Sequence, residues 1–157
     1  MLNELNVGDS ATIADKANEI IGDHAGDSQT GFAALIKARA LVESGDADEA
    51  KKLLRSLIDK PVIEGLDELA QLRLARILLS ESNYDEALTL TDAGSNAFKP
   101  HYQELRGDIY MAQGKLDAAR KAYKSALSDP SALASGQQLR MKLDSLGDDS
   151  PGDGENS

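Results

Sequence analysis

One seven-residue pattern occurs three times in this chain, each time between two stretches with helical spacing of apolar residues. The copies cover residues 44–50, 81–87 and 113–119, and each ends on an alanine. Those alanines are 37 and 32 residues apart. Repetition at such a period is typical of solenoids, in which each unit buries its apolar face against its neighbours.

Each part of the pattern has a mechanical reason. A glycine or a small polar residue ends the first helix, where a left-handed backbone conformation costs little. We expect Asp46 and Asn83 to cap the next helix through their side-chain oxygens. Acidic residues in the first turn, such as Asp48 and Glu49, suit the positive end of the helix dipole. The alanine that ends each copy is small, so the paired helices can approach closely.

The third copy is the most complete. Gly107 precedes Gly114 by seven residues, and Tyr123 and Pro130 follow. This arrangement resembles the tetratricopeptide consensus, a pair of antiparallel helices with a period of about 34 residues, although Gln103 stands where tryptophan is usual. The sequence therefore predicts an all-α fold, a tetratricopeptide-like right-handed superhelix of antiparallel helix pairs with an N-terminal helix and a C-terminal capping helix.

The repeats set the expected boundaries. We expect a ragged start over residues 1–9, a tetratricopeptide-like domain over 10–146 with repeats at about 31–62, 68–99 and 100–130, and a disordered acidic tail over 147–157. An amphipathic helix from Ser10 to Ile21 and a capping helix over 131–146 would cover the two ends of the solenoid. A small insertion is expected from Lys60 to Gly65; whether the 37-residue spacing reflects a longer loop or an extended helix stays open.

Composition and charge exclude several classes of function. The 157 residues carry a formal net charge of −10, and such a field repels phosphate backbones, so we expect no nucleic-acid partner. The chain has no cysteine, which rules out disulfides, thiolate metal sites and thiol catalysis. No stretch approaches the ~18 apolar residues of a membrane span, and residues 1–8 do not form a signal peptide.

The first helix of each tetratricopeptide repeat lines a concave binding face. Transferred to the first two repeats, the face positions predict a partner-binding groove formed by Phe32, Leu35, Arg39, Val42, Leu69, Leu72, Arg76 and Leu79. The groove suits an apolar peptide, with Arg39 and Arg76 pairing with carboxylates or backbone carbonyls. In the third repeat the same positions turn acidic, with Glu104 and Asp108. Alternatively, the N-terminal helix, the tail or a second copy fills the groove, which would make a homodimer.

No constellation of residues predicts catalysis. His24 and His101 have no His or Cys partner at ligand spacing, so we expect no metal site. The acidic pairs at 48–49 and 85–86 are explained by the helix dipole, and no nucleotide-binding motif occurs. We therefore expect no catalytic residues and no cofactor, and a protein that is not an enzyme.

The second half of the chain has a narrower resemblance. Residues 72–79 (LRLARILL), 105–110 (LRGDIY), 114–120 (GKLDAAR) and 140–146 (RMKLDSL) are similar to motifs of the YfgM-type ancillary subunits of the bacterial Sec translocon. The resemblance covers roughly residues 11–146. It implies a tetratricopeptide domain on the periplasmic side of the inner membrane, held there by one membrane helix. It also implies partners in the Sec translocon and a membrane-anchored periplasmic chaperone.

Together these patterns indicate a protein–protein interaction module. On this resemblance we expect the chain to be a soluble fragment, attached to the membrane only through a segment that it lacks; a natural soluble paralogue is the alternative. The alternative function is a self-associating structural protein or soluble scaffold whose groove is filled by its own copy. The identity of the bound peptide and the oligomeric state stay open.

Overall fold

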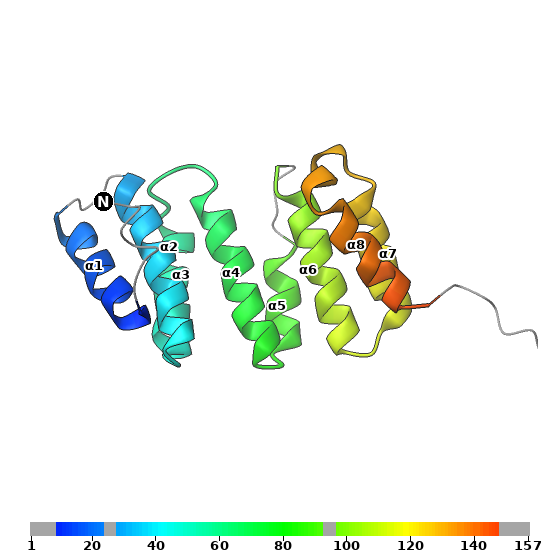
Figure 1. Ribbon diagram of the computed structural model, residues 1–157, viewed down its shortest axis with the longest axis horizontal. Helices are drawn as coiled ribbons and strands as arrows, with labels where there is room; N and C mark the ends of the chain where they lie inside the picture. Colours follow the sequence, from blue (N-terminus) through cyan, green and yellow to red (C-terminus); the bar gives the residue numbers. More distant parts are fainter. Residues whose placement is uncertain (1–8, 24–27, 93–96, 148–157) are drawn as a thin grey trace, which may run out of the picture. The chain divides into compact units, whose positions relative to one another are not determined.

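The computed structural model describes residues 9–23, 28–92 and 97–147, and within these ranges the regular structure is helical, with no β-strand (Figure 1). The elements are α1 (Ser10–Asp23), α2 (Ser28–Glu43), α3 (Ala47–Asp59), α4 (Leu66–Ser80), α5 (Tyr84–Leu90), α6 (Lys99–Ala112), α7 (Leu116–Leu127), the 3-10 helix η2 (Pro130–Ala134) and α8 (Gly136–Ser145). The predicted all-α class is confirmed. The chain divides into two compact units, residues 1–93 and 94–157, which are described separately.

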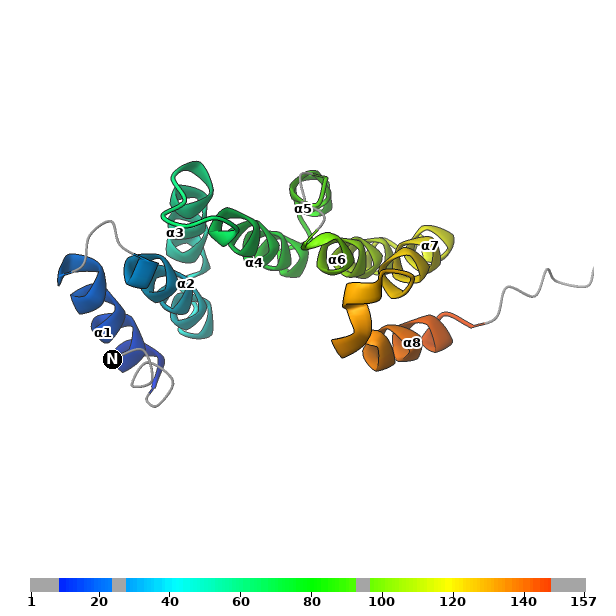
Figure 2. The same cartoon turned by 90° about the horizontal axis from the view of Figure 1, so that it is seen from above.

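In the first unit, consecutive helices pack on one another from α1 to α5, so α3 contacts both α2 and α4 (Figure 2). Alanine and leucine fill the spaces between them: the fully buried residues include Ala17, Ala33, Ala50, Leu54, Ala70, Ala75 and Ala87. Small side chains at these contacts let the helix backbones approach closely. Ala50 and Ala87 are fully buried, as the expected close packing requires.

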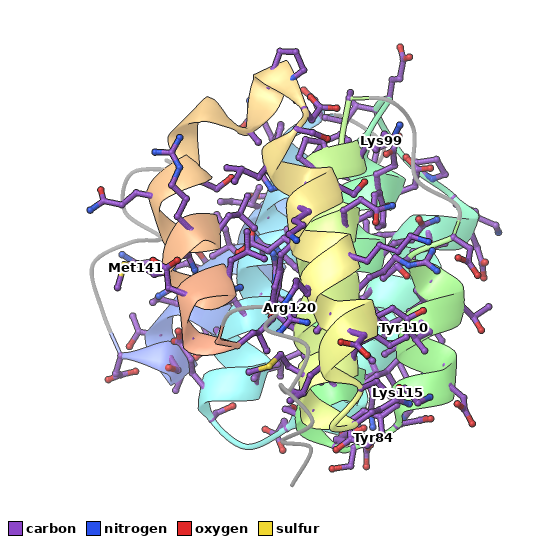
Figure 3. The ribbon with its side chains drawn as sticks, turned by 90° about the vertical axis from the view of Figure 1, so that its right-hand side faces the viewer. Tyr84, Lys99, Tyr110, Lys115, Arg120 and Met141 are labelled. Carbon is purple, nitrogen blue, oxygen red and sulfur yellow. The ribbon has the colours of Figure 1, made fainter. Side chains whose placement is uncertain are left out.

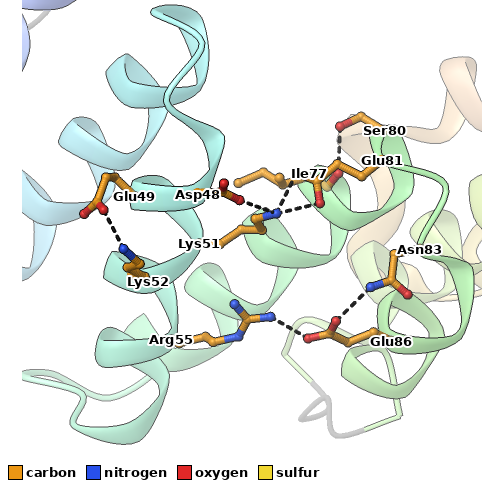
Figure 4. Close-up of polar contacts among 10 residues, drawn as sticks. All are labelled: Asp48, Glu49, Lys51, Lys52, Arg55, Ile77, Ser80, Glu81, Asn83 and Glu86. Carbon is orange, nitrogen blue, oxygen red and sulfur yellow. Dashed lines mark hydrogen bonds and ion pairs between the residues drawn. The ribbon is translucent and has the colours of Figure 1, made fainter.

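Ion pairs also link the helices of the first unit. The ammonium of Lys51 on α3 lies 2.7 Å from a carboxylate oxygen of Glu81, at the end of α4. A guanidinium nitrogen of Arg55, one turn further along α3, lies 2.6 Å from a carboxylate oxygen of Glu86 on α5 (Figure 4). These pairs connect the second helix of one repeat to both helices of the next.

The second unit contains α6, α7, η2 and α8, with α6 and α8 both packed on α7. The expected closing helix over 131–146 starts differently in the structure: a 3-10 turn covers Pro130–Ala134, and α8 begins only at Gly136. The side chain of Asp129 accepts a hydrogen bond from the Ser131 amide at 2.9 Å and holds the tighter turn. Pro130, the first residue of this 3-10 turn, has a fixed φ that suits a helix start and has no N–H that would lack an acceptor there.

The three turns between paired helices share one hydrogen-bond pattern. In each turn a backbone N–H donates a hydrogen bond to the backbone carbonyl five residues earlier. The pairs are Asp46 to Leu41 at 2.8 Å, Asn83 to Leu78 at 2.8 Å, and Lys115 to Tyr110 at 2.9 Å. The residue before each donor has a positive φ: Gly45 at 92°, Ser82 at 62° and Gly114 at 72°. These are Schellman motifs, which satisfy the last carbonyls of the first helix.

The predicted side-chain caps at Asp46 and Asn83 are wrong. Neither side chain accepts a hydrogen bond from the helix that follows, and ψ is 50° at Asp46 and 69° at Asn83. The Schellman turn imposes this backbone conformation, which differs from the extended one in which a cap side chain reaches the second or third amide. The side-chain amide of Asn83 donates instead, through Nδ2, to a carboxylate oxygen of Glu86 at 2.9 Å (Figure 4).

The 37-residue spacing comes from a helix and not from the expected insertion. Helix α3 continues to Asp59, nine residues past Ala50, whereas α5 ends at Leu90, three residues past Ala87. The connection over residues 60–65 is shorter than the connection over residues 91–98. The first repeat is therefore longer because its second helix extends further.

Candidate functional site

A pocket of about 310 Å³ lies in the first unit between α2, α3 and α4. Its described lining consists of Ala38, Arg39, Val42 and Glu43 from α2, Leu54 from α3, and Arg73, Arg76 and Ile77 from α4. Because α3 packs against both α2 and α4, a residue of α3 can close the bottom of a space between them. Leu54 takes this place and is fully buried.

The interior of the pocket is apolar. Ala38, Leu54 and Ile77 are all buried and form its floor. Val42 lies one turn beyond Ala38 on α2 and is 41% exposed. An apolar pocket with a few polar groups at its edge is the usual form of a site that holds a small ligand or one side chain of a partner.

Three arginines surround this apolar floor. The side chain of Arg39 is 68% exposed, Arg76 is exposed, and Arg73 is half-buried. Arg73 donates a hydrogen bond from Nη1 to the backbone carbonyl of Leu35 at 2.5 Å, which ties α4 to α2. Burial, and then the nearby guanidiniums of Arg39 and Arg76, lower the pKa of Arg73 below its ordinary value. The guanidinium of Arg73 is therefore close enough to those of Arg39 and Arg76 to be repelled by both.

Glu43 supplies the acidic side chain in the described lining. It accepts a hydrogen bond from Nε of Arg39 at 2.7 Å, and its second oxygen accepts one from the hydroxyl of Ser10 at 3.1 Å. The bond from Arg39, and then that from Ser10, lower the pKa of Glu43. Arg76, in contrast, has no hydrogen bond or ion pair with any residue that the structure describes. The pocket thus keeps positive charge that its own carboxylate does not pair.

The structure separates the predicted groove residues into two groups. Arg39, Val42 and Arg76 meet at the pocket, and Phe32 is 41% exposed on α2. Leu35 and Leu72 are each 3% exposed, so they belong to the core and support this surface from beneath. The other two, Leu69 and Leu79, are partly buried on α4. The part that any of these residues plays in binding stays a prediction.

Sequence reasoning missed Arg73 and the residues of the floor. Arg73 lies three residues before Arg76, and this spacing brings the two side chains to neighbouring positions on one helix. Helical spacing could therefore have identified Arg73. Leu54 could not be identified in this way, because it lies on the second helix of a repeat and the groove was predicted from first helices alone.

In the second unit, Lys142 of α8 forms ion pairs with two acidic residues of α6. The ammonium of Lys142 on α8 lies 2.8 Å from a carboxylate oxygen of Glu104 and 2.7 Å from one of Asp108. The hydroxyl of Tyr123 donates to the same Asp108 oxygen at 2.7 Å. Burial, and then this hydrogen bond, raise the pKa of Tyr123. The acidic positions of the third repeat are therefore partnered within their own unit.

Arg120 fixes the end of α8. It lies on α7, labelled in Figure 3, and its guanidinium donates hydrogen bonds to the backbone carbonyls of Leu146 and Gly147, both at 3.2 Å. A cation at these carbonyls also suits the negative end of the helix dipole.

The described residues include neither a helix that could span a membrane nor a cluster of metal ligands. Over 9–23, 28–92 and 97–147, none of the helices is both long and apolar enough to cross a bilayer. Within the same ranges, no three His, Cys, Asp or Glu side chains gather as ligands for a metal ion. His24 lies outside the described residues, and His101 is exposed on α6.

Antiparallel helix pairs joined by a repeated Schellman turn define an α-helical repeat protein. The model of one family, described as a tetratricopeptide repeat-like domain, matches residues 1–148, and the chain belongs to that family. The predicted tetratricopeptide-like fold is thereby confirmed.

Curated relatives carry the name ancillary SecYEG translocon subunit. The protein of that name from Neisseria gonorrhoeae is 34% identical over 116 residues, which are 73% of this chain and 56% of the relative. The one from Aggregatibacter actinomycetemcomitans is 28% identical over 134 residues, 85% of this chain and 65% of the relative. The one from Haemophilus influenzae is 30% identical over 116 residues, 73% and 56% of the two chains. The predicted resemblance is confirmed.

This chain spans between 56% and 65% of the length of these three relatives. No solved structure matches it.

Proposed function

We propose that this chain is the protein-binding domain of an ancillary subunit of the Sec translocon, attached to the bacterial inner membrane and lying on its periplasmic side. One observation of the structure carries the proposal: an apolar pocket edged by three arginines opens on the first unit of a tetratricopeptide repeat-like fold. The names of the curated relatives direct the proposal toward the translocon.

The chemistry of the pocket favours binding over catalysis. An arginine side chain stays protonated at any physiological pH, so it can hold an anion but cannot serve as a general base. Glu43, the carboxylate in the described lining, is already engaged by Arg39 and Ser10. A site of this kind provides an apolar contact and fixed positive charge, which are the elements of peptide recognition.

As partners we propose the SecYEG translocon and a membrane-anchored periplasmic chaperone. The pocket is reached from solvent at Arg39, Val42 and Arg76, which are all exposed, so a partner can enter without unfolding the first unit. The alternative occupant is a second copy of this chain, which would make the domain self-associating.

Photo-cross-linking in cells tests the proposal and separates the two occupants. A photoreactive phenylalanine analogue replaces Phe32 or Val42, both 41% exposed on the first unit, and Leu116, 48% exposed on the second unit, serves as the control position. We expect cross-links to translocon subunits or to the chaperone from positions 32 and 42. Products containing only a second copy of the chain would favour self-association, and equal cross-linking from position 116 would contradict a specific site.

A further inference from the structure

We propose that the pocket between α2, α3 and α4 recognises a carboxylate adjacent in sequence to an apolar side chain, presented by an extended segment of the partner protein. This inference rests on the proposed function, because it specifies the chemistry of that module's partner. Two independent features of the pocket carry it: an apolar floor that takes the side chain, and a group of three guanidiniums whose neighbouring carboxylate in the described lining, that of Glu43, is paired with Arg39.

The floor defines the apolar half of the ligand. Ala38, Leu54 and Ile77 are buried at 2%, 0% and 8% exposure, and they offer no polar atom of their side chains to a ligand. A Leu- or Phe-sized side chain held there is itself removed from water, and it also covers part of Val42, which is 41% exposed. A volume of about 310 Å³ holds one such side chain together with a neighbouring group, and not a whole helix.

The guanidiniums define the charged half. Arg39, Arg73 and Arg76 meet at one pocket in a chain whose formal net charge is −10. Like charges this close disfavour one another, and an anion placed among them relieves that repulsion. The planar guanidinium matches the two oxygens of a carboxylate, and a backbone carbonyl of the partner would not neutralise the charge. A carboxylate is therefore the better of the two ligands that the arginines can bind.

Glu43 competes for the same cations. It already accepts a hydrogen bond from Arg39, and Ser10 at the start of α1 holds its second oxygen. An incoming carboxylate is consequently directed toward Arg76, which lacks a partner among the described residues, and toward Arg73 at the base. Replacing Glu43 by a neutral residue removes a like charge from the edge of the site and should strengthen the binding of an acidic ligand.

A titration with two matched dipeptides tests these points on the 157-residue chain. Binding of N-acetyl-Leu-Glu-amide and of N-acetyl-Leu-Gln-amide is followed by shifts of backbone amide resonances in NMR spectra. We expect the Glu dipeptide to bind about fivefold more tightly at low salt, with shifts on the pocket-lining residues of α2, α3 and α4, and expect this preference to shrink as salt screens the charges.

Variants assign the preference to particular residues. Arg76→Gln should abolish the preference for the Glu dipeptide, Glu43→Gln should increase it, and Lys52→Gln, at a cation 71% exposed on α3 and outside the lining, should leave it unchanged. Arg76→Glu should bind N-acetyl-Leu-Lys-amide more tightly than the unchanged chain does, a change that a merely structural role for Arg76 would not produce. Arg76 is exposed, so these variants should fold, which circular dichroism checks.

Three results would overturn the inference: equal affinity for the Glu and Gln dipeptides, amide shifts confined to residues away from the pocket, or a preference that survives Arg76→Gln. Loss of the dipeptide preference with cross-links from Phe32 and Val42 intact would remove this inference and leave the proposed function standing. Dipeptide binding without any cross-link to the translocon or the chaperone would contradict the proposed function and leave the carboxylate preference of the pocket standing.

Discussion

The aromatic ring of Tyr123 on α7 lies against the backbone of Gly107 on α6, in the space where any other residue would place its Cβ. A Cβ built at position 107 would lie 2.8 Å from the Cζ atom of that ring and closer still to two other ring carbons. The Tyr123 hydroxyl then reaches the carboxylate of Asp108, the next residue of α6. One tyrosine thus determines how closely the two helices of the third repeat pack.

Gly107→Ala should lower the free energy of unfolding by about 2 kcal/mol, because overpacking against a buried ring outweighs the higher helix propensity of alanine. Urea denaturation followed by circular dichroism measures the change. Gly136→Ala is the matched control in the same unit, since a Cβ there meets only Leu127 at 3.8 Å. If both variants were equally stable, the close contact between Tyr123 and Gly107 would not constrain the helix pair.

Ser82→Gly should stabilise the first unit by about 1 kcal/mol, since a left-handed conformation strains any residue with a side chain and glycine adopts it freely. Ser82 is the non-glycine residue with positive φ in the described part of the chain. Gly45→Ser, at the equivalent turn one repeat earlier, should be destabilising by a similar amount. Chemical denaturation of both variants checks the prediction, and a change of the same sign in both would contradict it.

Lys142→Met should lower the free energy of unfolding at neutral pH by about 1 kcal/mol, a value reduced for partial solvent screening, because it leaves Glu104 and Asp108 without their cation. Lys121→Met, at an exposed position of α7, is the control and should change little. Denaturation midpoints of the two variants measure the difference, and a Lys142→Met variant as stable as Lys121→Met would refute it.

The pH dependence of that difference has a definite sign. Burial opposes the charged form of Lys142, but the hydrogen bonds to Asp108 and Glu104 outweigh it and raise the pKa above its ordinary value of 10.5. The folded state therefore holds this proton more strongly than the unfolded state does. From neutral pH upward, the stabilisation should be complete below about pH 10.5 and should disappear only as the pH rises through the raised pKa. A stabilisation that grew as the pH rose through the titration range of Lys142 would contradict this.

Leu72→Ala should cost about 3 kcal/mol of stability, because it opens a cavity beneath the predicted groove. Phe32→Ala, at a side chain 41% exposed, should change the stability by less than about 1 kcal/mol. Thermal unfolding separates the two. A large loss of stability in Phe32→Ala would show that this side chain serves the core and not a binding surface.

Local patterns were enough to predict the helix pairs and their turns. The Schellman bonds span only five residues, so the chain near Gly45, Ser82 and Gly114 specifies each turn with little help from distant residues. The same locality explains the error at Asp46 and Asn83: their residue types suit a cap, but the turn immediately before them sets a different ψ.

The candidate site was predicted only in part. Helical spacing placed Arg39, Val42 and Arg76 on one face, and the structure brings them to one pocket, while their part in binding stays a prediction. Spacing could not tell which apolar residues of that face would stay open, because burial depends on the helix that packs beneath. Leu35 and Leu72 became core residues, and Leu54 of α3 became the floor.

What the sequence by itself determined is the order of helices, their turns and the repeat family, since hydrogen bonds between near neighbours and the spacing of small and apolar residues decide them. What only the tertiary structure decided is which charges remain unpaired. Arg73 finds the carbonyl of Leu35 and Lys142 finds Glu104, each across 38 residues, and no local pattern anticipates either contact. Lys142 thereby partners an acidic residue of α6, whereas Arg76 stays exposed at the pocket without a partner among the described residues.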